Sequence, residues 1–341
     1  MADEPRFSVR RAQLDLLLGL DQPGAAFARA FVTASFGGPP IAASHATAPA
    51  QELAALAMRV YVRATADLDP QEGHRLGVQW LAELRAGRAD RLALRSCLVT
   101  TAVVARRAGH VEVAIGQLRE AMELSRTAPG RRQVALELAI ALRRRAGEGD
   151  LAEALGLAEA LAAERLFDYG DKTNATVLEA DHEVLQARLA LGEHDVESAL
   201  DLRARRLWRS GFMSRWTGEA FFIAGRCWLA RAHGPAAPGD ATIARLIADR
   251  YPLDRELSAA VDLLLADTYL ALAEGSSEPA DQRRLAAEAA GRAAATLAFA
   301  YGEAHPQVTA ARARAEMLTP SASGGPAAHA DGGRGERPSH R

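Results

Sequence analysis

The sequence contains little cysteine and almost no lysine, and each shortage excludes a class of protein. Its two cysteines, Cys97 and Cys227, lie 130 residues apart, which matches neither a metal-binding motif nor a disulfide framework. Only one of the 41 basic residues is a lysine, Lys172, a bias typical of a GC-rich genome. A P-loop needs glycine directly before its lysine, and because Asp171 stands there, this lysine does not belong to a nucleotide-binding loop of that type.

Neither sign of charge dominates, and no long apolar run is present. The 41 basic and 43 acidic residues are interspersed and give a net charge of −2, so no basic surface is expected for nucleic acid or an anionic membrane. The densest basic run, residues 143–145, is interpreted as a helix end, where cations interact well with the helix dipole. The opening residues MADEPRF do not resemble a signal peptide, and no segment has the length and apolarity of a membrane span. We therefore expect a cytoplasmic protein with no membrane or direct nucleic-acid partner.

Aromatic residues make up only 5% of the chain, whereas alanine, which favours helix, is abundant. Apolar residues recur at helical spacing from about Phe7 to Leu318, and no segment shows the alternating β-branched pattern of a strand. The sequence therefore predicts an all-α fold. A chain of 341 residues is too long for one ordinary core, so either two domains or a repeat array is expected.

One short pattern decides between these two, because it returns five times: a pair of helix-stopping residues followed by an alanine five positions after the first. In such a pair glycine ends one helix, aspartate caps the next, and the small alanine lets the paired helices approach closely. The alanines are spaced by 40, 45, 45 and 42 residues, as expected for stacked helical hairpins: Ala114, Ala154, Ala199, Ala244 and Ala286. The sequence therefore predicts a solenoid.

Two segments resemble a known repeat family. Residues 108–129, AGHVEVAIGQLREAMELSRTAP, resemble the second helix of a tetratricopeptide repeat. Residues 286–318 resemble the kinesin-light-chain type of this repeat, in which a long second helix ends in a turn that here reads GEAHP, residues 302–306. The resemblance covers roughly residues 91–318. It implies a right-handed superhelical solenoid of stacked antiparallel hairpins, with the first helices on the concave face and a protein or peptide as partner.

Composition divides the chain into three parts. Residues 1–50 are interpreted as a helical cap and a loop rich in small residues and proline, since a solenoid must cover its apolar end. Residues 51–318 are assigned to the repeat array, where the pair Gly73-His74 is interpreted as a worn repeat. Residues 319–341 contain Gly, Pro, Ser and His without an apolar anchor, which predicts a disordered tail.

An acidic row on the first helix of the third repeat is the first candidate site. Glu179, His182, Glu183 and Gln186 lie near one helix face, which we expect to be the concave face. Two glutamates would suit a basic partner residue or a ligand amine. Glu-x-x-His is half of a di-iron motif, but no second copy occurs in the repeat region, so no metal or other cofactor is expected.

An aromatic cluster is the second candidate, because six of the 18 aromatic residues fall within residues 208–228. Two interpretations stay open: the rings fill the gap between hairpins, or they form a peptide or ligand pocket beside the acidic row. In the second case Phe212 and Trp216 are the expected contacts. Lys172, in a polar loop at the edge of the same region, is a further candidate.

These observations favour a non-catalytic scaffold or regulator that binds a peptide or protein segment on the concave face of the repeats. The alternative is a sensory regulator that binds a small molecule or signalling peptide in an aromatic and acidic groove. An enzyme on a helical-repeat frame is the third hypothesis, and it would need His182 and an acid within hydrogen-bond distance of a substrate.

Overall fold

A computed structural model of the chain describes residues 25–36, 48–87, 89–231, 236–252 and 254–319, and these ranges contain fourteen helices and no strand. The helices are α2 Ala25–Phe36, α3 Ala48–Leu68, α4 Pro70–Ala86, α5 Arg91–Arg107, α6 Val111–Leu124, α7 Ala128–Arg145, α8 Asp150–Tyr169, α9 Ala175–Ala190, α10 Val196–Ser210, α11 Arg215–Ala230, α12 Ala237–Ala248, α13 Arg255–Gly275, α14 Pro279–Tyr301 and α15 Pro306–Leu318.

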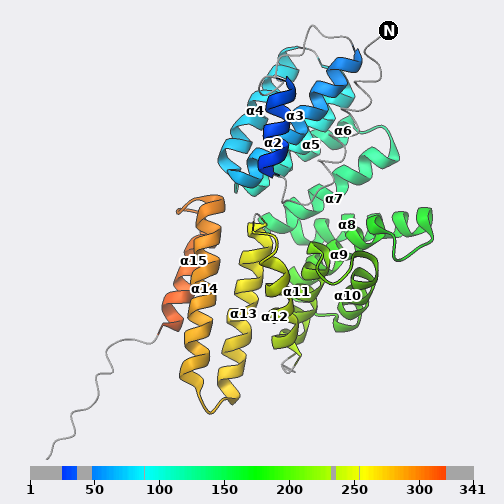
Figure 1. Cartoon of the computed structure of the whole chain (residues 1–341). Coiled ribbons are helices and arrows are strands. Elements are labelled where there is room, and N and C mark those ends of the chain that lie inside the picture. Colours follow the sequence, from blue (N-terminus) through cyan, green and yellow to red (C-terminus); the bar gives the residue numbers. More distant parts are fainter. Residues whose placement is uncertain (1–24, 37–47, 88, 232–235, 253, 320–341) are drawn as a thin grey trace, which may run out of the picture.

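Consecutive helices pack as hairpins, and the hairpins stack in chain order (Figure 1). The first helices of successive hairpins, α3, α5, α7, α9, α11 and α13, each contact the next one, whereas each second helix contacts its own partner and the following first helix. The first helices therefore share one side of the stack, which we call the inner surface. The predicted all-α solenoid of stacked hairpins is confirmed.

The repeat alanines lie in the packed interior of this stack. All five, Ala114, Ala154, Ala199, Ala244 and Ala286, are completely buried. Glycine follows a helix end as predicted at Gly109 and Gly192, with φ values of 85° and 82°, whereas Ala146 is the C-cap of α7 and Gly149, with a φ of 78°, is the N-cap of α8. A residue with a side chain would be strained at these angles. Asp195 caps α10 by accepting a hydrogen bond from the amide of Ser198 at 3.0 Å.

Three of the predicted turns are wrong, because the pairs lie inside helices. Gly73 lies in α4, which begins earlier, at the Asp69 cap and Pro70. Asp240 lies in α12 and pairs with Arg203 at 2.6 Å instead of capping a helix. Asp281 similarly lies in the first turn of α14. In all three cases a proline lies in the first turn of the helix, a position to which proline is suited.

The predicted cap and tail fall mainly outside the described residues; of these segments the structure describes α2, which packs on α3. Cys97 and Cys227 are free and buried, and burial raises their thiol pKa values to about 12 and about 11. Within the described part of the chain, every helix falls short of the length and apolarity that crossing a membrane requires.

Gly73 allows α3 and α4 to approach closely. Substitution of this glycine by alanine tests how much the close approach contributes to stability. A Cβ at this position would lie 2.5 Å from the backbone Cα of Ala66. We expect Gly73→Ala to lower the free energy of unfolding by about 1–3 kcal/mol, since the backbone must shift. Gly116→Ala is the matched control, because Gly116 lies exposed in α6 with nothing within 4 Å of its Cβ position. The control should gain about 0.5–1 kcal/mol from helix propensity in urea unfolding, and equal effects of the two substitutions would contradict the prediction.

Candidate functional site

The acidic row and the aromatic cluster meet where α9 and α11 pack together on the inner surface. His182 of α9 places its Nε2 atom 3.5 Å from a carboxylate oxygen of Glu219 of α11, and both side chains are largely buried. Glu219 also pairs with Arg215 at 3.2 Å. His182, which was expected to face a partner, therefore makes a polar contact with the neighbouring helix, and Glu219 was not among the predicted residues.

The two predicted glutamates already have arginine partners. Glu183 is only 2% exposed and accepts two hydrogen bonds from Arg143 of α7, at 2.6 and 3.0 Å. Glu179 pairs with Arg165 of α8 at 3.3 Å. Because both carboxylates are neutralised within the chain, the expected attraction for a basic partner group is weaker than their sequence positions imply.

The environment of His182 keeps its ring neutral. Burial lowers the pKa of His182 well below its usual value of 6.5, and three nearby guanidinium groups lower it further. These belong to Arg206, Arg143 and Arg215. With its Nε2 atom near Glu219, the neutral ring is able to donate one hydrogen bond and accept another.

Arg206 and Trp216 form the floor of this cluster. Arg206 of α10 is 2% exposed, and its guanidinium carbon lies 4.9 Å from the centre of the Trp216 ring. Arg215 lies on the same ring at 5.2 Å, so the half-buried indole is held by two cations. Among the described residues, no acceptor forms a hydrogen bond with Nε or Nη2 of Arg206.

The remaining candidates are Gln186, Phe212 and Lys172, which lie around this cluster. Gln186 is half-buried one turn beyond His182 on α9. Phe212, in the turn before α11, is 43% exposed and packs edge-to-face on Phe221 at 6.2 Å between ring centres. Lys172 is exposed in the loop between α8 and α9, where its backbone carbonyl accepts a hydrogen bond from Arg205 at 2.9 Å. The structure therefore brings Glu179, His182, Glu183 and Trp216 near one another, with Phe212 and Lys172 at the edge.

The basic run 143–145 does end a helix, as predicted, but its three side chains reach three different partners. Arg143 pairs with Glu183 of α9, Arg144 with Glu256 of α13 at 2.8 Å, and Arg145 with Asp150 of α8 at 2.6 Å. The sequence did not indicate Arg143 and Arg144 as site residues, because their partners lie 40 and 112 residues away. In the sequence, the three adjacent arginines were the feature that could have identified them as site residues.

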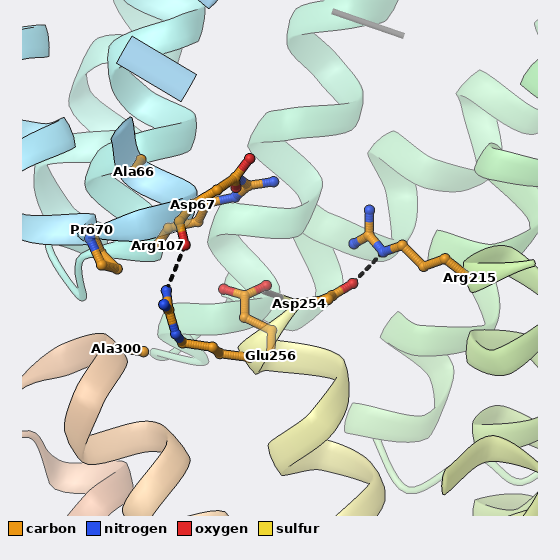
Figure 2. Close-up of a pocket in the computed structure, with 9 residues that line it drawn as sticks. Ala66, Asp67, Pro70, Arg107, Arg215, Asp254, Glu256 and Ala300 are labelled. Carbon is orange, nitrogen blue, oxygen red and sulfur yellow. Dashed lines mark hydrogen bonds and ion pairs between the residues drawn. The ribbon is translucent and has the colours of Figure 1, made fainter. Parts of the chain in front are cut away.

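A pocket adjoins the cluster where the last hairpins meet the first ones (Figure 2). Asp67 of α3 and Arg107 of α5 line one side, and these two side chains form an ion pair. Asp254 and Glu256, at the start of α13, line the other side with Arg215, which pairs with Asp254. The pocket is thus polar and contains both signs of charge.

No family model matches this chain, and no curated protein shows a significant match.

The geometry suits recognition through fixed hydrogen-bonding groups and one aromatic ring. Among the described residues, no group of three or more histidine, cysteine, aspartate or glutamate side chains could hold a metal ion.

The neutral state of His182 predicts a pH dependence of stability. The unfolded chain binds a proton at this residue near pH 6.5, whereas the folded protein does not, so the free energy of unfolding decreases as the pH falls below that value. The slope from one site is at most about 1.4 kcal/mol for each pH unit. His182→Gln removes this contribution, and we expect it to lose less stability than the parent between pH 7 and pH 5 in urea unfolding.

His194→Gln is the control, because His194 lies in the loop before α10, outside the cluster. It should keep the pH dependence of the parent. The same dependence in His182→Gln and the parent would show that the ring at position 182 becomes protonated in the folded protein.

Proposed function

We propose that this chain is a cytoplasmic, non-catalytic interaction protein of the tetratricopeptide type, which binds a peptide or protein segment on its inner surface. The observation that carries the proposal is the cluster between α9 and α11, where the half-buried Trp216 lies between two guanidinium groups beside the neutral His182. An aromatic anchor surrounded by polar groups is typical of the centre of a binding surface.

The order of this cluster supports recognition. Ion pairs fix Arg143, Glu183 and Arg215 from neighbouring helices, so the hydrogen-bonding groups have their positions before a partner arrives. Preorganisation of this kind reduces the entropy lost on binding. Because the nearby glutamates are already paired, the partner segment is expected to interact with the indole ring, His182 and the guanidinium groups.

A comparison of two tryptophans tests the proposal. Peptides are selected from a random library on the full chain, and their affinities are measured for the parent, Trp216→Ala and Trp208→Ala. We expect Trp216→Ala to lose about 2 kcal/mol, or about 30-fold in affinity, as a binding anchor does. Trp208 is 83% exposed on the second helix α10 and serves as the matched control, whose removal should leave the affinity unchanged. Equal affinities for all three proteins would contradict binding at the inner cluster.

A sensory regulator with a small ligand is the second candidate, and one observation favours it. Arg206 has two buried nitrogen atoms without an acceptor among the described residues, next to the Trp216 ring. A small carboxylate-bearing ligand would satisfy them. This candidate predicts that a defined organic acid raises the melting temperature of the parent but not of Trp216→Ala.

A further inference from the structure

The contact between the first and last hairpins differs from every other contact in the stack. Four buried apolar clusters run along the described chain, over residues 28–154, 178–227, 221–290 and 259–311. None of these clusters of described residues joins α13–α15 to α2–α8, although α14 contacts α4 and Figure 1 shows α14 and α15 beside the first hairpins. The contact between these two ends, which we call the seam, therefore lacks an apolar core.

Polar groups make the seam instead. Glu256 of α13 pairs with Arg144 of α7 at 2.8 Å and with Arg106 of α5 at 3.5 Å. The hydroxyl of Tyr301 donates a hydrogen bond to the same carboxylate at 3.1 Å. Arg255, the preceding residue, donates to the backbone carbonyls at the end of α3, at 2.8 and 3.2 Å. Two adjacent residues of α13 thus provide most of the polar contacts with the first hairpins.

The Glu256 carboxylate lies among several arginine side chains. Burial alone would raise the pKa of Glu256, but the arginines around it, Arg144, Arg106 and Arg107, outweigh burial and hold the pKa at about 2. Arg107 also pairs with Asp67 and Arg106 with Glu137, whereas among the described residues Arg144 forms its ion pair with Glu256 alone. Loss of the Glu256 carboxylate would therefore leave positive charge uncompensated where Arg144 and Arg106 meet.

A seam of this kind is easily reversed. The net stability of a half-buried ion pair is small, because the attraction must offset the loss of hydration, and salt weakens the attraction further.

The seam also connects directly to the proposed binding cluster. Next to Glu256, Asp254 pairs with Arg215, which pairs with Glu219, which lies 3.5 Å from His182.

We infer that the seam is an ionic latch centred on Glu256, which holds the solenoid closed and whose release gives a partner segment access to the inner surface. This inference rests on the proposed function. The opening is a change in the curvature of the stack, which a repeat array distributes over its interfaces.

Solution scattering on the full chain tests the latch without any partner. We expect Glu256→Gln at 150 mM NaCl to have a larger radius of gyration and maximum dimension than the parent, and the parent to approach these values at 1 M NaCl. Glu164→Gln is the matched control: it removes an exposed ion pair with Arg132 far from the seam and should leave the dimensions unchanged. Arg255→Gln is the second variant, used if circular dichroism shows that Glu256→Gln is unfolded, because it weakens the same contact without exposing the arginines around Glu256.

The affinity of library peptides that bind the parent is then measured for each variant, because it reports how accessible the inner surface is. If the open form is about a tenth of the parent population, release of the latch should raise the affinity about ten-fold. Unchanged dimensions in folded latch variants and at high salt would overturn the inference, as would expansion with unchanged peptide affinity. Expansion with no peptide bound by any variant would instead contradict the proposed function and leave the latch standing.

Discussion

Polar pairing between successive first helices is the constraint on which the inner surface depends. Arg143 of α7 pairs with Glu183 of α9, His182 of α9 lies on Glu219 of α11, and Arg215 of α11 pairs with Asp254 at the start of α13. Glu256 of α13 then returns to Arg144 of α7. The four helices are therefore linked in a polar ring, and within the candidate site His182 and Glu183 each have a partner in that ring.

This ring positions residues more than it stabilises the fold. Buried ion pairs contribute little net free energy, whereas removal of one partner leaves an uncompensated charge that is costly to bury. The stability of the stack comes from the apolar clusters and the buried alanines that bring hairpins together. The two roles are separated in space, because second helices and the contact faces of first helices carry the apolar groups, and the inner surface carries the charges. Substitutions in the ring are consequently expected to affect recognition and closure first.

The fold was predictable from the sequence because its determinants are local. Each repeat alanine is small enough to be buried where helices pack, and a glycine such as Gly192 follows a helix end with backbone angles that favour glycine. The site was predictable only in part, because its charges are set by long-range partners. Glu183 looked available to a ligand in the sequence, yet its partner Arg143 lies 40 residues earlier. Arg144 meets a partner 112 residues later, and no spacing rule indicates such a pair.

The shortage of lysine matters for this architecture, whatever its origin. The chain contains 40 arginines, the 41 basic residues less one lysine, and the planar guanidinium group can contact two carboxylates at once. Arg106 does so with Glu137 and Glu256, and therefore ties the first repeats both to their neighbour and to the last hairpins. Links between neighbouring repeats are reinforced by apolar packing, whereas the link to Glu256 is not. Closing a loop of more than one hundred residues also carries the larger entropy cost. If the ring opens anywhere, it should therefore open at Glu256, where the shared arginines meet a junction that none of the buried apolar clusters of the described residues spans.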